Sequence, residues 1–568
     1  LLGLFSTSNA LEHYALDHTR KSVRALMDLS PDVATVAGLS GETVVPVEQL
    51  VIGDTIVVRP GERIPADSEI VTGATEVDQS AITGESMPIA RTIGHPVFAG
   101  TVNGSGAFRA QVTRPQSEST LARITKMVAE AQDQKGRAER FTEKFEGPYA
   151  IGVIVFAVLV WIVPILFGVD RSDAFYRAIT VLVVASPCAL VISTPAATLS
   201  AIANAARNGV LVKGGSYLDS LGVVDTIAFD KTGTLTIGHP SLTDLRVFGD
   251  IDASAALRLV AAVEHLSEHP IAKAIVDGAE AAETSLPAGE GFASEPGKGV
   301  EASVEGVWVG VGNERMFEER GIPVSREACD AATEIRSAGK TAVLGATNSG
   351  VFAVVGVADK VRPGVVEALA ELRELGVERM VMLTGDHRLV AEAIAAQVGI
   401  DEIHAELQPD EKLEMIGSMQ RGNRLATVGD NPSRRVAMVG DGINDAPALA
   451  SADLGVAMGA GGTDVALETA DVVLITGDLR RLAYAIRLSR RMRTTIRFCI
   501  GFALTVIVVL LALSLTVGIP LPLGVVGHEG STIVVVVAGL SLLLFGRGKR
   551  RGSRPGVAAV PTAQPAGD

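Results

Sequence analysis

The sequence is poor in cysteine and carries no excess of positive charge. Its three cysteines, Cys188, Cys329 and Cys499, form no Cys-x-x-Cys pair, so we expect neither a disulfide framework nor a zinc knuckle. The formal net charge of −15 argues against nucleic acid as the main partner. The sequence has no internal repeat. It also has no Gly-x-x-x-x-Gly-Lys-Ser/Thr pattern, which excludes a P-loop nucleotide site.

A signal peptide pattern and an initial methionine are also missing. The chain starts inside an apolar stub, Leu1 to Phe5. We therefore expect the N-terminus to be truncated and the chain to begin near the end of a membrane helix.

Long apolar runs are present, and they alternate with charged segments. The 568 residues are enough for several domains. A mean hydropathy of +0.33 together with 20% charged residues indicates membrane helices joined to charged globular domains. The arginine-rich segment 480–497 and the basic residues after Phe545 predict cytoplasmic ends. The apolar runs predict two pairs of membrane segments, at 149–168, 174–203, 500–519 and the shorter 533–545.

The central motif is Asp230-Lys231-Thr232-Gly233-Thr234-Leu235-Thr236. It follows an apolar, β-branched run at 223–229, which predicts a buried strand that ends at the acid. Open α/β sheets place their chemistry at such strand ends, and the small residues after Lys231 leave backbone N–H groups free to hold an anion. These features suit a carboxylate nucleophile that takes a phosphoryl group from a nucleotide. The heptapeptide resembles the phosphorylation motif of the P-type ATPases, which implies that Asp230 is phosphorylated with Lys231 and Thr232 beside it.

Three later motifs can meet Asp230 at one edge of a sheet, because two follow strand-like runs and one opens a helix. They resemble the haloacid-dehalogenase-like phosphorylation domain of the same family. The resemblance implies a phosphate site in which the Thr384 hydroxyl and the Lys412 ammonium hold oxygens. Its residues are Thr384, Gly385, Asp386, Lys412 and Asn444. The expected oxygen ligands of Mg²⁺, a hard cation, are Asp230, Thr232, Asp441 and Asp445.

A strand-rich segment precedes these motifs, and its period-2 runs between Gly and Pro turns predict a small β domain. It contains Thr83-Gly84-Glu85-Ser86, which alone is a weak motif that also fits an exposed turn. Upstream of the Asp230 motif, it resembles the actuator-domain loop of P-type ATPases. The resemblance implies that Glu85, with Thr83 and Gly84, positions the water that hydrolyses the acyl phosphate.

The polar segment after Asp230 looks like an inserted domain. It carries a His-Pro pair and short glycine repeats, each of which is commonplace alone. In this order they resemble the nucleotide-binding domain of the heavy-metal subfamily, where a histidine contacts adenine near a glutamate and several glycines. Glycines permit close approach, and an imidazole can stack or hydrogen-bond. The residues implied are Glu264, His269, Gly297, Gly299, Gly310 and Gly312.

Ser186-Pro187-Cys188 interrupts the second apolar run. Proline frees a backbone carbonyl, which is tolerated where the backbone lines a cavity. A cysteine beside the break can bind metal as a thiolate, although a proline kink with a packed cysteine explains the same residues. In the last apolar run before Asp230, the motif resembles the Cys-Pro-Cys-type metal motif of heavy-metal P-type ATPases. Serine in place of the first cysteine removes one thiolate, which counts against Cu(I).

His528-Glu529-Gly530-Ser531-Thr532 precedes the last apolar run. By spacing alone the pair also fits an interfacial loop, since an acidic residue at mid-membrane costs about 2.5–3.5 kcal/mol. The pentapeptide resembles the His-Glu-Gly-x-Thr motif of the heavy-metal ATPase subgroup with Ser-Pro-Cys, which is associated with cobalt and, variably, iron, nickel and zinc. The resemblance implies one site for the transported ion, formed by Ser186, Cys188, His528, Glu529 and Thr532.

We therefore predict a multidomain membrane protein. It should combine an α-helical transmembrane bundle, a β-rich actuator domain, an α/β haloacid-dehalogenase-like phosphorylation domain and an inserted α+β nucleotide-binding domain. The expected boundaries are 1–19 for the end of a membrane helix, 20–140 for the actuator domain, 141–220 for the first membrane pair, 221–237 and 356–476 for the phosphorylation domain, 238–355 for the nucleotide-binding domain, 477–548 for the second membrane pair and 549–568 for a disordered tail.

The resemblance implies ATP-driven export of a divalent transition metal, cobalt ahead of zinc, nickel and iron, through an aspartyl phosphate. We expect a bacterial plasma-membrane protein with cytoplasmic catalytic domains, which uses ATP and Mg²⁺ and receives metal from a cytoplasmic donor. Two alternatives stay open. One is a pump for a hard ion such as K⁺ or Ca²⁺, which Cys188 and His528 disfavour. The other is a non-transporting metal sensor on the same scaffold, which the intact Asp230, Glu85 and Lys412 disfavour.

Overall fold

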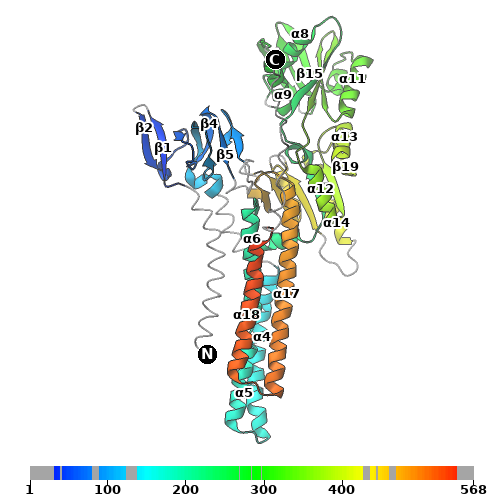
Figure 1. The fold of residues 1–568 in the computed structure, drawn as a ribbon. Helices are drawn as coiled ribbons and strands as arrows, with labels where there is room; N and C mark the ends of the chain where they lie inside the picture. Colours follow the sequence, from blue (N-terminus) through cyan, green and yellow to red (C-terminus); the bar gives the residue numbers. More distant parts are fainter. Residues whose placement is uncertain are drawn as a thin grey trace, which may run out of the picture. The chain divides into compact units, whose positions relative to one another are not determined.

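The computed structural model describes residues 31–38, 41–79, 88–122, 137–267, 269–282, 284–295, 297–425, 435–442, 445–459 and 468–546. These residues belong to two compact units (Figure 1). We call one the membrane unit; it includes Arg137–Asn204 and the chain from Arg491 onward. We call the other the catalytic unit; it consists of Val23–Gly136 and Ala205–Arg490.

The first part of the catalytic unit is a β domain, as predicted. Its six-stranded antiparallel sheet has the order β2-β1-β3-β9-β4-β7, and a three-stranded sheet has the order β6-β5-β8. Buried and exposed residues alternate along β9, so one face of the sheet covers a core that includes Ile56, Ile64 and Ile70. The strands are β1 Val33–Gly38, β2 Gly41–Pro46, β3 Thr55–Val58, β4 Asp67–Gly73, β5 Thr75–Asp78, β6 Ile89–Arg91, β7 Pro96–Val97, β8 Val102–Asn103 and β9 Phe108–Arg114.

The central domain of the catalytic unit is a seven-stranded sheet with the order β10-β22-β21-β20-β11-β18-β19. All neighbouring pairs are parallel except β10 with β22. β10 lies in the range that we assigned to the first membrane pair, so this sheet begins earlier in the chain than expected. The strands are β10 Val210–Val212, β11 Val224–Asp230, β18 Arg379–Leu383, β19 Glu402–His404, β20 Arg435–Gly440, β21 Leu454–Met458 and β22 Val472–Leu474. The helices are α7 Gly215–Leu221, α12 Val365–Glu374, α13 Arg388–Val398, α14 Pro409–Leu425 and α15 Ala446–Ser451.

An antiparallel sheet with the order β12-β17-β16-β15-β14-β13 is inserted between β11 and β18. α8 and α9 pack on one face, over a core that includes Val260 and Val343. α10 and α11 pack on the other face with Leu344, because successive side chains of β16 point to opposite faces. The strands are β12 Ser241–Val247, β13 Gly289–Glu295, β14 Gly299–Val304, β15 Val307–Gly312, β16 Thr341–Thr347 and β17 Gly350–Ala358. The helices are α8 Ala253–Glu264, α9 Pro270–Ala281, α10 Glu314–Glu319 and α11 Arg326–Ser337.

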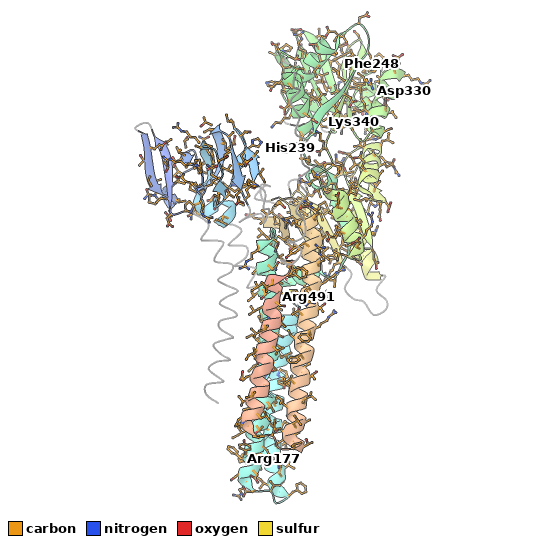
Figure 2. The ribbon with its side chains drawn as sticks, viewed as in Figure 1. Arg177, His239, Phe248, Asp330, Lys340 and Arg491 are labelled. Carbon is orange, nitrogen blue, oxygen red and sulfur yellow. The ribbon has the colours of Figure 1, made fainter. Side chains whose placement is uncertain are left out.

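The membrane unit is helical, and the described part of the chain contains four helical spans long and apolar enough to cross a membrane. Figure 2 shows the side chains along these helices. Apolar residues such as Ile151, Leu166 and Val508 are exposed, as expected for surfaces that face lipid. The spans are Lys144–Leu166, Arg171–Arg207, Arg480–Thr516 and Leu521–Leu544. The helices are α4 Arg137–Leu166, α5 Arg171–Val184, α6 Cys188–Arg207, α17 Arg480–Thr516, α18 Leu521–Leu540 and the short η5 Ser541–Leu544.

Two of the predicted apolar runs differ from the helices. The run at 174–203 is two helices, α5 and α6, because the chain leaves the helical conformation between Val184 and Cys188. The run at 533–545 is only the C-terminal part of the span Leu521–Leu544. His528 therefore lies inside α18, and the interpretation of this segment as an interfacial loop is wrong.

Candidate functional site

Asp230 is the last residue of β11, a central strand between β18 and β20. The backbone turns sharply after it, and Gly233 adopts a positive φ of 70°. A Cβ at this position would lie 3.0 Å from Asp441 Oδ2, so only glycine lets the loop pass this close to the neighbouring carboxylate. The parallel strands thus bring acids from different parts of the chain to one edge, as predicted.

A cavity of about 480 Å³ opens at this edge. Its lining includes the predicted phosphate-site residues within the described chain, namely Asp230, Lys231, Thr232, Thr384, Gly385, Asp386, Lys412, Asp441 and Asp445. The lining also includes His269 of the inserted domain. The cavity therefore combines a buried carboxylate, cationic side chains and oxygen donors.

Lys412 bridges two acids in this cavity. Its Nζ donates to Asp230 Oδ1 at 2.7 Å and to Asp445 Oδ1 at 2.8 Å. Burial, followed by the charge of Asp445, raises the pKa of Asp230 to about 7, although the charge and hydrogen bond of Lys412 act in the opposite direction. Burial opposes the charge on Lys412 as well, but Asp230 and Asp445 outweigh it and raise the pKa of Lys412 to about 12. The ammonium group of Lys412 therefore stays charged, and the described lining of the cavity holds more acidic than basic side chains.

This excess of acid fits a divalent cation. Asp441 raises the pKa of Asp230 further, and the described lining of the cavity holds more aspartates than lysines. Within the described chain no three His, Cys, Asp or Glu side chains form a closed metal cluster. Mg²⁺ does not need one, because it takes one or two carboxylates and completes its shell with water and phosphate oxygens.

Lys231 and Asp386 form an ion pair at the side of the cavity. The Thr384 hydroxyl accepts a hydrogen bond from the Asp386 N–H at 3.1 Å, which fixes the loop after β18. Asp386 thereby holds the side chain of Lys231, the residue directly after Asp230.

A second pocket of about 310 Å³ lies in the inserted domain, between α8, α9 and the strands β14 and β15. Glu264 is 6% exposed at the end of α8, and burial raises its pKa to about 7. His269 caps α9, where its Nδ1 accepts the Ile271 N–H at 3.2 Å, and burial lowers its pKa while the charge of Asp386 opposes this shift. The pocket therefore presents a carboxyl group and an imidazole beside apolar walls.

Glycines open the same pocket, with one exception. Gly297, Gly299 and Gly312 line it. Gly310 is not among the lining residues. A Cβ there would meet Trp308 Cη2 at 2.6 Å and Phe317 Cε1 at 3.1 Å, so this glycine makes room for aromatic packing, and its role at the nucleotide stays a prediction.

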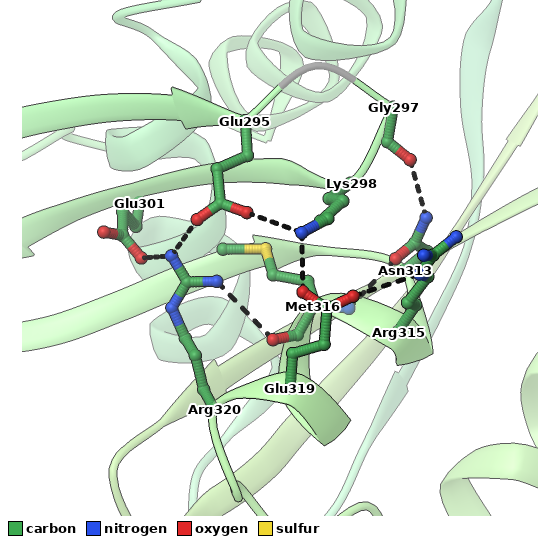
Figure 3. Close-up of polar contacts among 9 residues, drawn as sticks. All are labelled: Glu295, Gly297, Lys298, Glu301, Asn313, Arg315, Met316, Glu319 and Arg320. Carbon is green, nitrogen blue, oxygen red and sulfur yellow. Dashed lines mark hydrogen bonds and ion pairs between the residues drawn. The ribbon is translucent and has the colours of Figure 1, made fainter.

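Charged side chains form a network at the mouth of this pocket (Figure 3). Lys298 lies between Gly297 and Gly299 in the sequence. Its Nζ is 2.5 Å from Glu319 Oε2 and 3.3 Å from Glu295 Oε2. Arg320 Nη2 is 2.6 Å from Glu295 Oε1 and 2.8 Å from Glu301 Oε2. The network ties the turn between β13 and β14 to the end of α10.

Asn313 holds the glycine turn from the other side (Figure 3). Its side-chain amide donates to the Gly297 carbonyl at 2.9 Å, and its Oδ1 accepts the Met316 N–H at 3.1 Å as the N-cap of α10. One residue therefore caps the helix and fixes the pocket wall.

In the membrane unit, the predicted ion-site residues lie on two helices. Ser186 Oγ and Cys188 Sγ are 3.0 Å apart at the break between α5 and α6. His528, Glu529 and Thr532 are buried in α18. The structure does not gather these side chains into a closed metal cluster within the described residues.

Comparisons with known proteins show the family to which the chain belongs. Residues 28–129 match the family model of the P-type ATPase actuator domain, and residues 224–453 match that of haloacid dehalogenase-like hydrolases. A probable cobalt/nickel-exporting P-type ATPase of Mycolicibacterium smegmatis is 44% identical over 543 residues, which cover 96% of this chain and 81% of that protein. The chain belongs to the class IB P-type ATPases.

Two further relatives of this P-type ATPase carry other metals in their names. A probable cadmium-transporting ATPase of Staphylococcus aureus is 40% identical over 547 residues, covering 95% of this chain and 74% of the relative. The crystal structure of a zinc-transporting PIB-type ATPase in the E2.Pi state matches with a TM-score of 0.60 and 37% identity, covering 94% of this chain and 87% of that one. The family is therefore settled by similarity along nearly the whole chain.

The structure of the P-type ATPase also shows site residues that sequence reasoning missed. The Asp359 carboxylate accepts the Thr236 hydroxyl at 2.5 Å and the Gly238 N–H at 3.0 Å. Arg362 donates to the Gly233 carbonyl at 2.6 Å. In the sequence, Asp359 and Arg362 are only an acid and an arginine that follow a strand. The fold shows that both residues hold the loop after Asp230. The predicted residues Thr83, Gly84, Glu85 and Asn444 lie outside the described residues.

Proposed function

We propose that this P-type ATPase exports a divalent transition-metal ion, with cobalt as the first candidate and zinc, nickel and iron after it. The observation that carries the proposal is the helix break at Ser186-Pro187-Cys188, where one thiol lies 3.0 Å from one hydroxyl. One thiolate with imidazole, carboxylate and hydroxyl groups suits borderline divalent ions better than soft Cu(I). A relative whose name includes cobalt and nickel supports cobalt as the first candidate.

The phosphate site supports an aspartyl-phosphate mechanism. An ionised Asp230 attacks the γ-phosphorus of ATP, a bond to the carboxylate oxygen forms, and the bond to the ADP oxygen breaks. Lys412, 2.7 Å from Asp230, neutralises charge that develops on the transferred group, and the Thr384 hydroxyl holds one of its oxygens. Asp230, Thr232, Asp441 and Asp445 would hold Mg²⁺, which would supply further charge neutralisation.

The remaining steps use the predicted residues of the other domains. Adenine binds in the pocket of Glu264 and His269, against the close backbone of Gly297, Gly299 and Gly312. In our proposal Asn444 completes the phosphate site. Glu85, with Thr83 and Gly84, positions water on the acyl phosphate, whose hydrolysis regenerates Asp230.

The transported ion binds in the membrane unit. Its proposed ligands are Ser186, Cys188, His528, Glu529 and Thr532. The four apolar spans and the bacterial relatives support a bacterial plasma-membrane protein with cytoplasmic catalytic domains. A cytoplasmic donor protein that delivers the metal is part of the same proposal.

ATPase activity of the protein in detergent and lipid, titrated separately with Co²⁺, Zn²⁺, Ni²⁺, Fe²⁺, Cd²⁺ and Cu⁺, tests the proposal. Stimulation by Co²⁺ or another borderline divalent ion supports the proposed export, and the relative stimulation ranks the metal ions as transported substrates. Stimulation by Cu⁺ alone would overturn the ligand argument. Stimulation by K⁺ or Ca²⁺ instead would indicate a pump for a hard ion, and metal binding without phosphate release would indicate a sensor.

A further inference from the structure

The break between α5 and α6 leaves backbone groups without helical partners inside a membrane span. α5 ends at Val184 and α6 begins at Cys188. Pro187 has no N–H group, so it cannot donate to the carbonyls of the preceding turn. An unsatisfied carbonyl in the bilayer costs several kcal/mol, because no water is there to replace the lost hydrogen bond.

A tyrosine of a third helix satisfies the carbonyl of Ala185, the C-cap residue of α5 at this break. The Tyr149 hydroxyl, on α4, donates to the Ala185 carbonyl oxygen at 2.7 Å. Ala185 is only 3% exposed, so the hydrogen bond is made in a packed environment. The Tyr149 ring is held from its own helix by Phe145, with ring centroids 5.4 Å apart.

The carbonyl that Tyr149 holds lies next to the proposed ion ligands. Ala185 is directly before Ser186, and the Ser186 hydroxyl and Cys188 thiol are 3.0 Å apart. The orientation of the Ala185–Ser186 peptide group sets the direction of the Ser186 side chain and the start of α6. The phenol therefore acts on the part of the backbone that decides whether serine and cysteine converge.

We infer that Tyr149 is a positioning residue for the transported metal: its hydroxyl holds the open backbone at Ala185 and so keeps Ser186 and Cys188 directed at one ion. The inference rests on the proposed function. Without the hydroxyl the Ala185 carbonyl loses its partner, the backbone at the break rotates toward another donor, and the two ligands no longer converge. Metal affinity then falls while the nucleotide site is unchanged.

The chain offers a matched control in Tyr176. This tyrosine lies on α5, nine residues before Ala185, and its hydroxyl accepts the N–H of Leu521 at the start of α18 at 2.8 Å. Nine residues of helix are about 13 Å long. Tyr176→Phe therefore removes another interhelical hydrogen bond between a tyrosine hydroxyl and a backbone group of the same unit, but away from the break; this hydroxyl accepts, whereas that of Tyr149 donates.

The experiment compares wild type, Tyr149→Phe and Tyr176→Phe as whole protein in detergent and lipid. We expect Tyr149→Phe to raise both the Co²⁺ concentration for half-maximal ATPase stimulation and the Co²⁺ dissociation constant from equilibrium dialysis by about tenfold, which is the loss of one hydrogen bond. The thiolate-to-cobalt charge-transfer band should weaken at equal occupancy. The KM for ATP and the maximal rate should not change, and Tyr176→Phe should match wild type in metal binding.

The outcomes separate the two proposals. If wild type neither binds Co²⁺ nor is stimulated by a divalent metal, the proposed function fails. If wild type binds Co²⁺ but Tyr149→Phe behaves like wild type, or both tyrosine variants lose affinity equally, the positioning role is overturned. Replacement of Tyr149 by p-aminophenylalanine keeps a donor at the same place on the ring. It should restore wild-type affinity, and failure to do so in a folded protein would also overturn the role.

Discussion

The lysine at the centre of the phosphate cavity has two roles that can be measured separately. In the proposed mechanism Lys412 neutralises charge on the transferred phosphoryl group, and its charge also lowers the pKa of Asp230, which keeps more of this carboxyl group ionised. A protonated carboxyl group is not a nucleophile, so a pKa of about 7 makes phosphorylation fall as the pH drops through neutrality. Because Lys412 lowers the pKa of Asp230, removing it should raise this pKa further.

We predict that Lys412→Met moves the acid limb of phosphoenzyme formation to higher pH by about 1 to 3 units, besides slowing the reaction. The measurement is single-turnover incorporation of labelled phosphate from ATP as a function of pH at fixed Mg²⁺. Asp230→Asn, which has no nucleophile, sets the background and should form no phosphoenzyme. Arg258→Met removes an exposed pair with Glu305 and should leave the profile in place. An unshifted acid limb in Lys412→Met would show that Asp230 is not the titrating group.

Single residues were predictable where a motif combines chemistry with a strand end. Asp230, Thr384 and Asp441 each follow a strand of the same sheet, so parallel pairing was enough to place them together. Asp359 and Arg362 were not predictable as site residues, because their partners are backbone groups of a loop far away in the sequence. Gly310 makes room for the rings of Trp308 and Phe317, and no local pattern around this glycine predicts that packing.

At the scale of elements, the nucleotide pocket depends on how the turn between β13 and β14 is held against α10. Arg320 joins Glu295 of the turn to Glu301 of β14. Each of these partly exposed pairs is worth about 0.2–1 kcal/mol. We predict that Arg320→Met raises the KM for ATP about two- to tenfold at saturating metal and leaves kcat unchanged, because the loop becomes less ordered while the phosphate site stays intact.

The control for this variant is Arg326→Met, which removes the exposed Arg326–Asp330 pair on α11. Steady-state ATPase rates over a range of ATP concentrations measure both constants. A change in kcat with no change in KM would show that the network serves the phosphate site. Equal changes in KM for both arginine variants would show that KM responds to the loss of any positive charge, and not to the loss of this network.

Close packing of α18 on α6 is a second feature at this scale. A Cβ at Gly539 would lie 3.1 Å from the Ala197 nitrogen and 3.2 Å from the Ala196 Cβ, so small residues let the helices approach. We predict that Gly539→Leu lowers the thermal unfolding temperature by several degrees, since overpacking costs about 1–3 kcal/mol, and reduces metal-stimulated ATPase activity. Gly501→Leu is the matched control, because a Cβ there meets no atom within 4 Å. Equal melting temperatures of the two variants would refute the packing argument.

Hydropathy alone predicted only part of the structure of the membrane helices. Apolar runs predicted the spans, and Pro187 predicted the break between α5 and α6. The same runs placed His528 outside the last helix, because hydropathy treats an ionisable pair as an end of the apolar run. In the structure His528 and Glu529 are buried among neighbouring helices, which removes them from lipid and makes a position inside α18 tolerable.

At the scale of the whole molecule, the proposed phosphorylation site and the proposed site of the transported ion lie in different units. Asp230 belongs to the catalytic unit, and Cys188 belongs to the membrane unit. Pumping requires that ion binding at one site changes phosphorylation at the other, so the protein must pass between at least two global states that both sites influence. No motif encodes this coupling, and for that reason the sequence predicted the two sites but not how they communicate.

Cys188→Ala tests this coupling directly. Removing the thiol should abolish metal stimulation of ATPase activity, because the ion loses its softest ligand, and should leave the ATP dissociation constant within about twofold of wild type, because the nucleotide pocket is in the other unit. Equilibrium nucleotide binding and metal-titrated ATPase rates on the same preparation measure both quantities. Cys329→Ala, on α11 of the inserted domain, controls for the loss of a thiol and should behave like wild type. Metal stimulation that survives Cys188→Ala would place the ion elsewhere in the membrane unit, whereas loss of nucleotide binding would mean that the substitution unfolds the protein instead of uncoupling it.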